Sequence, residues 1–190
     1  TVSVLCLVVE LVELNELPIN YEWGDISESG ASCIVNPVNC VGVMGRGVAK
    51  QIKKKFPWSV WPYEQRCNRG EFVVGKIIAA KLSIVSEVSL KPPTIIHVAT
   101  KNHWRGKSKL DWVESCLISI NEFILSNSIE DIAIPKLGCG LGGLDWSDVE
   151  ELFNKYLDLN SCVVTIYDLE AKKNNAGGIQ KMLPLISEEE

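Results

Sequence analysis

The chain has 190 residues, of which 46% are hydrophobic and 23% are charged, a composition that excludes a disordered or fibrous protein. This length is enough for one domain with a sizeable core, and we expect a single domain over residues 1–190. The formal net charge of −5 argues against a protein that grips long duplex DNA through many phosphates, because such proteins are usually basic. It does not argue against a pocket for one modified nucleotide.

The cysteine pattern gives no metal site or disulfide framework. Seven cysteines are scattered without a CxxC pair, and only two histidines are present, so no structural zinc is expected. Thiols in a reducing cytoplasm are the simpler interpretation. The apolar run Val2–Val12 is too short to cross a bilayer and lacks the features of a signal peptide, and we interpret it as a strand.

The first third of the chain alternates short apolar runs with polar turns and then changes to helical spacing. Val48, Ile52 and Phe56 are four residues apart and define one face of a helix that ends at Pro57. The elements expected before this helix are, in order, a strand at Tyr21–Trp23, a loop or short capped helix at Ser27–Ser32 and a strand at Cys33–Val35.

The rest of the chain continues the alternation of strands and helices, which predicts an α/β sheet with helices on both faces. Two capping-box spacings predict helix starts, and residues 174–190 contain a weak helical patch and a frayed tail. The expected elements are a helix or irregular link at Trp58–Gly70, strands at Phe72–Ala80 and Thr94–Ala99 joined by a loop at Ser83–Pro93, a helix from the capping box Ser108–Asp111, a strand at Asp131–Pro135, a helix from the capping box Ser147–Glu150, and a strand at Val163–Tyr167.

Two glycine-rich loops each follow a predicted strand, at Asn36–Gly47 and Gly138–Gly143. Glycine permits positive φ and close backbone approach, so two such loops can hold opposite sides of a diphosphate. The alternative is that each loop is only a tight turn. Neither loop has the ending of a P-loop or the spacing of a Rossmann dinucleotide site.

Lys101 follows the Thr94–Ala99 strand, so its amine is expected at the sheet edge where α/β proteins bind ligands. Partial desolvation there would lower the pKa of Lys101 and make it a nucleophile. The alternative is a solvated surface charge, which is the usual state of a lysine.

Several other polar residues have a functional and a structural interpretation. Asp25 can accept a hydrogen bond from adenine or cap a turn, and Asn39 can bond ribose hydroxyls or fix its own loop. His103, Trp104 and Arg105 can stack on and bond to a base, or Trp104 can anchor the loop on the core. The remaining two candidates are read as structural, Cys139 as a packed thiol and His97 as a core histidine.

Taken together, these segments resemble the macrodomain family over about Tyr21 to Tyr167. Gly24-Asp25-Ile26 and the two glycine loops look like the adenine-binding and diphosphate-binding elements of that family. Two longer stretches, Ile95–Ser108 and Ile134–Trp146, resemble the branch of DarG-like antitoxin macrodomains, DNA ADP-ribosyl glycohydrolases that remove ADP-ribose from thymidine. That branch is similar to the terminal ADP-ribose glycohydrolases that act on modified glutamate.

The resemblance implies a three-layer α/β/α sandwich with a mixed central sheet, a core at about 21–168 and Lys101 as the catalytic residue. It implies ADP-ribose as ligand or product without a cofactor or metal, ADP-ribosylated single-stranded DNA as partner, a cognate DNA-ADP-ribosylating toxin, and no membrane. The expected ADP-ribose contacts are Asp25, Ile26, Asn39, Gly42, Val43, Met44, Gly45, Gly47, Thr100, Gly138, Cys139, Gly140, Leu141, Gly142 and Tyr167, with His103, Trp104 and Arg105 at the DNA base.

One departure bears on mechanism. The protein-directed relatives carry an aspartate in the second loop where this chain has Gly142, which favours the DNA-directed branch and leaves the general acid or base unnamed. A reader that binds ADP-ribose without cleaving it, and a hydrolase of ADP-ribosylated protein glutamate, are the two alternatives. Residues before about Tyr21 and after about Asp168 lie outside the resemblance.

Overall fold

The computed structural model describes residues 19–82, 92–157 and 161–168. Within them one sheet has the strand order β1-β6-β5-β2-β4-β3. Neighbouring strands are parallel except for β3, which pairs antiparallel with β4 at one edge, so the sheet is mixed as predicted. The strands are β1 (Asn20–Trp23), β2 (Cys33–Asn39), β3 (Ile77–Ala80), β4 (Thr94–Lys101), β5 (Asp131–Pro135) and β6 (Val163–Asp168).

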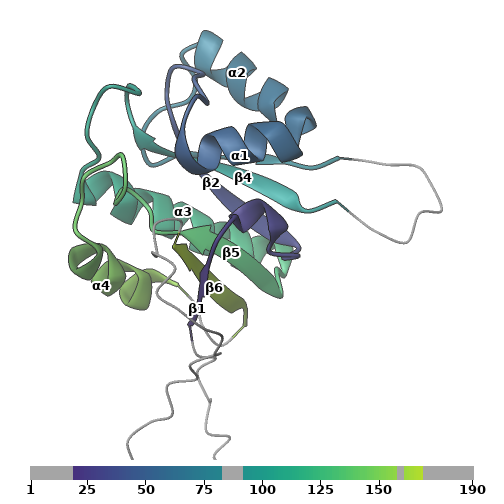
Figure 1. Cartoon of the computed structure of the whole chain (residues 1–190), viewed down its shortest axis with the longest axis vertical. Helices are drawn as coiled ribbons and strands as arrows, with labels where there is room; N and C mark the ends of the chain where they lie inside the picture. Colours follow the sequence, from purple (N-terminus) through teal and green to yellow (C-terminus); the bar gives the residue numbers. More distant parts are fainter. Residues whose placement is uncertain (1–18, 83–91, 158–160, 169–190) are drawn as a thin grey trace, which may run out of the picture.

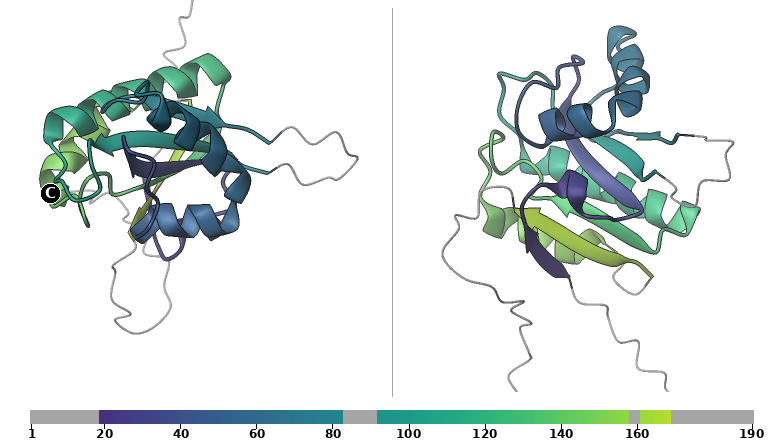
Figure 2. Two further views of the ribbon diagram at one scale, coloured as in Figure 1. Left: turned by 90° about the horizontal axis from the view of Figure 1, so that it is seen from above. Right: turned by 45° about the vertical axis from the view of Figure 1, so that its right-hand side comes forward.

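Helices cover both faces of this sheet, which confirms the predicted three-layer sandwich (Figure 1). Seen from above, the sheet lies between α3 on one side and α1 on the other (Figure 2). Among the described residues no helix is long and apolar enough to cross a lipid bilayer. The helices are η1 (Ile26–Glu28), α1 (Gly47–Lys55), η2 (Pro57–Ser59), α2 (Val60–Asn68), α3 (Leu110–Asn127) and α4 (Trp146–Tyr156).

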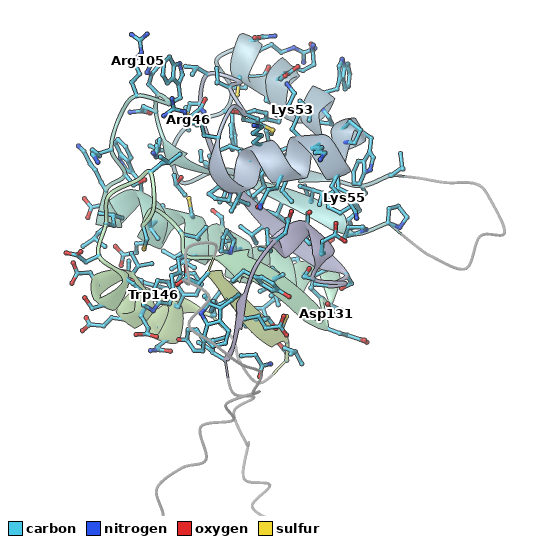
Figure 3. All side chains as sticks on the ribbon, in the orientation of Figure 1. Arg46, Lys53, Lys55, Arg105, Asp131 and Trp146 are labelled. Atoms are coloured by element: carbon cyan, nitrogen blue, oxygen red, sulfur yellow. The ribbon has the colours of Figure 1, made fainter. Side chains whose placement is uncertain are left out.

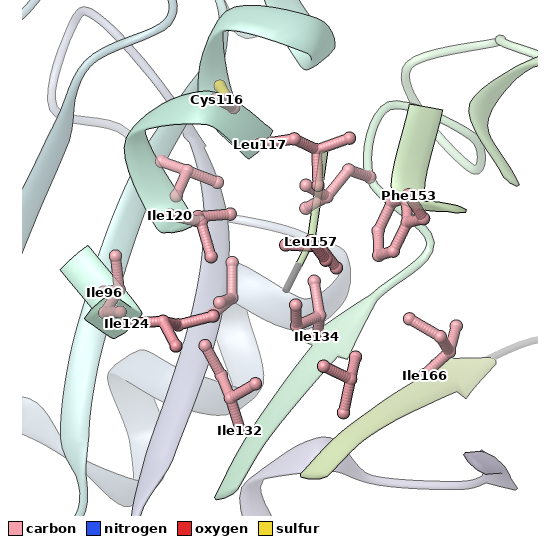
Figure 4. Close-up of a cluster of buried hydrophobic side chains, with 14 of the residues drawn as sticks. Ile96, Cys116, Leu117, Ile120, Ile124, Ile132, Ile134, Phe153, Leu157 and Ile166 are labelled. Atoms are coloured by element: carbon pink, nitrogen blue, oxygen red, sulfur yellow. The ribbon is translucent and has the colours of Figure 1, made fainter. Parts of the chain in front are cut away.

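The largest core lies between the sheet and the pair α3 and α4 (Figure 4). Leu117 and Ile120 of α3 and Phe153 of α4 are fully buried against Ile134 of β5 and Ile166 of β6. Their removal from water supplies the main driving force for this face, at about 1.5–3 kcal/mol for each large side chain. The apolar residues at helical spacing on α3 and the β-branched residues of the strands are therefore explained together, because they bury one another in this core.

The opposite face has two smaller cores that support the segments expected to bind ligand. Ile26 and Tyr167 are buried together with Ile52 of α1. Met44 of the first glycine loop is buried against Tyr63 of α2. This packing ties the loop that precedes α1 to the body of the protein.

Some predicted elements end elsewhere in the structure. The apolar run Phe72–Ala80 forms a strand only at Ile77–Ala80, because Gly75 has a φ of +81° and its N–H donates to Ala99 O. Trp58–Gly70 forms η2 and α2, with Pro62 in the first turn of α2, where no intrahelical N–H bond is required.

Both predicted capping boxes are wrong. The N-cap of α3 is Lys109, without a side-chain bond, because Ser108 is buried and its N–H donates to Gly142 O at 3.1 Å. The N-cap of α4 is Asp145, and Ser147 lies within the helix. The strand predicted at Val2–Val12, most of the loop at Ser83–Pro93 and the helical patch in 174–190 lie outside the described residues.

His97 confirms its prediction as a core residue. It is fully buried in β4 opposite Asn36 of β2. Asn36 Nδ2 donates to Nδ1 at 3.0 Å, and Nε2 donates to Ser59 O at 2.8 Å, so the neutral Nε2–H tautomer satisfies both partners. Burial lowers the pKa of His97 to about 4, and the bond to Ser59 opposes this shift in part.

We expect acidification to destabilise the fold through His97. The unfolded chain takes up a proton near pH 6.5, whereas the folded chain takes it up only near pH 4, so stability is full above pH 6.5 and falls between these values. The loss between pH 7 and pH 5 is about 2 kcal/mol. Urea unfolding of the wild type and of His97→Gln at both pH values measures it. An equal loss in both proteins would contradict the assignment to His97.

Candidate functional site

Every segment predicted to bind ligand leaves the carboxyl end of a parallel strand. Asp25 follows β1, Lys101 ends β4, the second loop follows β5, and Tyr167 lies at the end of β6. The first glycine loop, predicted from Asn36, begins after β2 at Cys40, because Asn36–Asn39 belong to the strand. Because these five strands run in one direction, their carboxyl ends meet at one edge of the sheet, where ligands bind in α/β folds. The fold thus brings together segments up to about 140 residues apart in the sequence.

Lys101 contacts the second glycine loop, and that loop lies beside the first one. Lys101 Nζ donates to Leu141 O in the second loop at 2.6 Å. The Leu141 side chain reaches over to the first loop, where its Cδ1 lies 3.9 Å from the position that a Cβ on Gly47 would occupy. The three segments therefore form one site, with Leu141 as the residue that joins them.

The first loop is held by Asn39 at the end of β2. Asn39 Oδ1 accepts from Val41 N at 3.0 Å and from Val43 N at 3.3 Å, and Asn39 Nδ2 donates to Val43 O at 2.7 Å. The hydroxyl of Tyr63, a residue that the sequence did not indicate, donates to Asn39 O at 2.9 Å. The structure gives Asn39 the loop-fixing role, and its contact with ribose remains a prediction.

Removing the Asn39 amide should loosen the first loop. Asn39→Ala leaves the N–H groups of Val41 and Val43 without this acceptor, and we expect a loss of about 2 kcal/mol in stability. We expect the affinity for ADP-ribose, the ligand that the family resemblance implies, to fall about tenfold, because the loop is no longer pre-ordered. Urea unfolding and calorimetric titration measure the two effects. The exposed Asn154→Ala on α4 is the matched control and should stay within about 0.5 kcal/mol of the wild type.

The second loop is a tight structure in which two glycines are sterically required. Gly138 has a φ of +73°, and Leu144 N donates to its carbonyl at 3.1 Å. A Cβ on Gly142 would lie 1.9 Å from Gly138 O and 2.6 Å from Ser108 Oγ. The loop in this conformation therefore has no room for an acidic side chain at residue 142.

The pKa of Lys101 is shifted in the direction predicted from the sequence. Partial burial lowers the pKa of Lys101, and the nearby positive charge of Lys107 lowers it further. No carboxylate pairs with Lys101 within the described residues. A neutral amine is therefore more accessible here than on a solvated lysine.

The segments predicted to bind adenine are partly built from buried residues. Ile26 and Tyr167 share one apolar cluster, and the Tyr167 hydroxyl donates to Glu22 Oε2 at 2.6 Å. Asp25 Oδ1 accepts from Ser27 N at 2.9 Å and caps η1, so the turn-capping interpretation holds. An adenine contact from the exposed carboxylate remains a prediction.

A cleft of about 300 Å³ lies beside Asp25, between η1 and α1. Its other walls include Lys50, Lys54 and Lys55 of α1, and neither glycine loop contributes to it. It is therefore separate from the expected diphosphate position.

The segment after Lys101 carries an exposed aromatic and basic group. Trp104 is 47% exposed, with the Arg105 guanidinium 4.4 Å from its ring centre and the His103 ring 5.3 Å away. The alternative that Trp104 anchors this loop on the core is disfavoured, because Trp104 is half exposed and belongs to none of the three hydrophobic clusters of the described residues. The predicted compact set is present, and its contact with a DNA base remains a prediction.

Cys139 is a packed thiol, as predicted. Burial raises its pKa to about 11, so the thiol stays protonated at neutral pH and is a poor nucleophile. Within the described residues, no group of three or more His, Cys, Asp or Glu side chains is arranged to hold a metal ion. Lys107 and Ser108, which contact the second loop, were missed as site residues; the alternating basic residues around Lys107 were the available signal.

A mixed sheet between helical layers, with two glycine loops and a lysine at its carboxyl edge, defines a macrodomain. Residues 35–153 match the Macro domain family, and the chain belongs to it. Its similarity to solved structures agrees, since the macrodomain of DarG from Mycobacterium tuberculosis superposes with a TM-score of 0.70 at 38% identity, over 80% of this chain and 97% of that one.

Two further relatives carry more specific names. The chain is 39% identical over 150 residues to a DNA ADP-ribosyl glycohydrolase of Mycobacterium tuberculosis, covering 78% of this chain and 42% of that protein. The structure of Thermosipho africanus DarTG in complex with ADP-ribose matches with a TM-score of 0.69 at 33% identity, over 83% of this chain and 43% of that one. The chain thus spans less than half the length of these two relatives.

Proposed function

We propose that this macrodomain binds ADP-ribose and hydrolyses its bond to a thymidine base in single-stranded DNA. The observation that carries the proposal is the position of Lys101, whose Nζ is held 2.6 Å from Leu141 O between the two glycine loops, without a paired carboxylate among the described residues. The relative named DNA ADP-ribosyl glycohydrolase supports the choice of substrate.

In this proposal the chain positions the ligand from both ends. The backbone N–H groups of the two loops bind the diphosphate, while Asp25, Ile26 and Tyr167 hold the adenine end. Asn39 and Thr100 lie near the distal ribose. Fixing the adenosine diphosphate in this way orients C1 of the distal ribose toward Lys101.

Lys101 can act by two routes, both of which consume one water and return a proton to the base nitrogen. In the first route the sugar ring opens by breaking its C1–oxygen bond, and the ring oxygen takes a proton. The neutral Lys101 amine then adds to C1, the C1–N bond breaks as a proton returns to the base nitrogen, water hydrolyses the resulting imine, and the sugar ring closes again. As an ammonium, Lys101 stabilises the charge that develops on the departing base while water attacks C1. The lowered pKa of Lys101 favours the first route.

The test is a side-by-side release assay on two substrates, a thymidine-modified single-stranded oligonucleotide and a glutamate-modified protein. We expect release of ADP-ribose from the oligonucleotide and little from the protein. Release only from the protein would assign the glutamate-directed activity. Binding of ADP-ribose without release from either substrate would make the domain a reader.

Borohydride separates the two roles of Lys101. The imine route predicts a covalent ADP-ribose adduct on Lys101 when the reductant is added during turnover, seen by mass spectrometry of the digested protein. An oligonucleotide that is fully hydrolysed without any adduct would assign the ammonium route.

The wider setting is also part of this proposal. A cognate toxin that ADP-ribosylates DNA would supply the substrate, and a Thermosipho africanus relative named as a fusion of a DNA ADP-ribosyl transferase with a DNA ADP-ribosyl glycohydrolase supports such a pairing. The thiols at the six described cysteines are in keeping with a reducing cytoplasm. Residues 1–190 are taken as one domain.

A further inference from the structure

Residues 101–109, which connect β4 to α3, carry a basic side chain at every second position; we call them the basic strap. These side chains are Lys101, His103, Arg105, Lys107 and Lys109, and no acidic residue interrupts them. The whole chain has a net charge of −5, so this concentration of positive charge contrasts with the rest of the molecule. Such a segment attracts a polyanion locally.

Both ends of the basic strap are fixed to the second glycine loop. At one end Lys101 Nζ donates to Leu141 O at 2.6 Å. At the other end Ser108 N donates to Gly142 O at 3.1 Å, and Lys107 Nζ would lie 2.8 Å from a Cβ on Gly143. The basic side chains of the strap therefore include Lys101 and lie next to the second glycine loop.

The tip of the basic strap is a closed turn that presents its side chains outward. Gly106 N donates to His103 O at 2.9 Å, and Arg105 N donates to His103 Nδ1 at 3.3 Å. The Arg105 guanidinium stacks 4.4 Å from the Trp104 ring centre, which leaves its N–H edge available to a phosphate. Arg105 projects from the same end of the molecule as Arg46 of the first loop (Figure 3).

In the part of the chain that the structure describes, no carboxylate forms an ion pair with these basic side chains. Lys136 and Lys155 elsewhere in the fold pair with Asp168 and Glu114. Within the described ranges, no ion pair involves Arg105, Lys107 or Lys109, and all three side chains are exposed. The positive charge is therefore available to an incoming ligand.

We propose that the basic strap binds the backbone phosphates that flank the modified nucleotide in a single DNA strand. This inference rests on the proposed function and adds to it, because it makes the strand, and not the modified nucleoside alone, the recognised substrate. Arg105 and Lys107 are the phosphate-binding residues, and exposed Trp104 stacks on an unpaired base. A single strand offers such bases without the cost of opening a duplex.

The test compares two substrates, ADP-ribosylated thymidine as a nucleoside and the same unit within a ten-nucleotide strand. We expect a higher kcat/KM for the strand, and contacts with two flanking phosphates would make that value fall about sevenfold between 50 and 200 mM salt. The nucleoside lacks those phosphates and should show a much smaller dependence. The difference between the two salt slopes isolates the flanking contacts.

Arg105→Gln and Lys107→Gln should each reduce that difference in slope by about 0.7, the value for one phosphate of a single strand. Lys81→Gln removes the same charge next to Ala80, which pairs with Ile95 at the opposite end of β4 from Lys101, and should leave the slopes unchanged. Equal slopes for strand and nucleoside, or equal effects of all three variants, would overturn the inference while the proposed function stands. Release from neither substrate would overturn both.

Discussion

Lys101→Met should lower the release of ADP-ribose from a modified thymidine oligonucleotide about 10³-fold, a loss of ~4 kcal/mol in transition-state stabilisation. The methionine keeps an apolar stem of similar length and removes the amine that lies 2.6 Å from Leu141 O. Binding of ADP-ribose should weaken only a few-fold, because the glycine loops and the residues proposed to hold adenine are intact. Single-turnover release and calorimetric titration measure the two quantities.

Lys101→Arg makes this prediction more specific. It keeps a positive charge but cannot form an imine, since its guanidinium stays protonated. The imine route predicts that Lys101→Arg is as inactive as Lys101→Met, whereas the ammonium route predicts recovery of about tenfold or more. Release at the wild-type rate by Lys101→Met would remove Lys101 from the mechanism.

The second large effect is expected at Gly142. A Cβ at this position would lie 1.9 Å from Gly138 O and 2.5 Å from Gly138 C, backbone atoms of the same loop that cannot move independently. Gly142→Ala should therefore reshape the second loop, destabilise the fold by about 2–3 kcal/mol and reduce ADP-ribose affinity about 100-fold. Thermal unfolding and titration with ADP-ribose measure these changes.

Gly45→Ala is the matched control for stability. A Cβ on Gly45 meets no atom within 4 Å, and its φ is not positive, so the midpoint of unfolding should stay at the wild-type value. Gly142→Asp should lower the stability of the fold and the affinity for ADP-ribose at least as much as Gly142→Ala. If Gly142→Asp folded normally and gained activity on modified glutamate, the loop would be more adaptable than its geometry indicates.

The sequence predicted the fold class because its strands and helices each depend on local patterns. Val48, Ile52 and Phe56 predicted the face of α1, and the apolar run at residues 94–99 predicted most of β4. Local spacing was insufficient where a distant segment competes for a backbone group. Ser108 has the spacing of a capping residue, but Gly142 O, 34 residues further on, takes its N–H, and the side chain is buried instead.

The candidate site was predictable in its location but not in its internal bonding. A glycine loop or lysine that follows a parallel strand must lie at the carboxyl edge, so convergence follows from topology alone. The contact of Lys101 with Leu141 O, and the three bonds that Asn39 makes within its own loop, depend on loop shapes that no periodicity encodes. The chemical roles of these residues remain predictions until the assays above are done.

The pairing of β1 with β6 has a consequence for synthesis of the protein on the ribosome. Asn20 pairs with Thr165 and Trp23 with Asp168, so β1 cannot pair until β6 has been synthesised. Asp25 follows β1 directly, and Tyr167 lies within β6. A nascent chain that has emerged only as far as α4 thus has both glycine loops and Lys101 but lacks Tyr167, one of the residues proposed to hold adenine. Contacts of such long sequence separation also slow folding, so ligand binding should appear only after β6 has emerged from the ribosome and paired with β1.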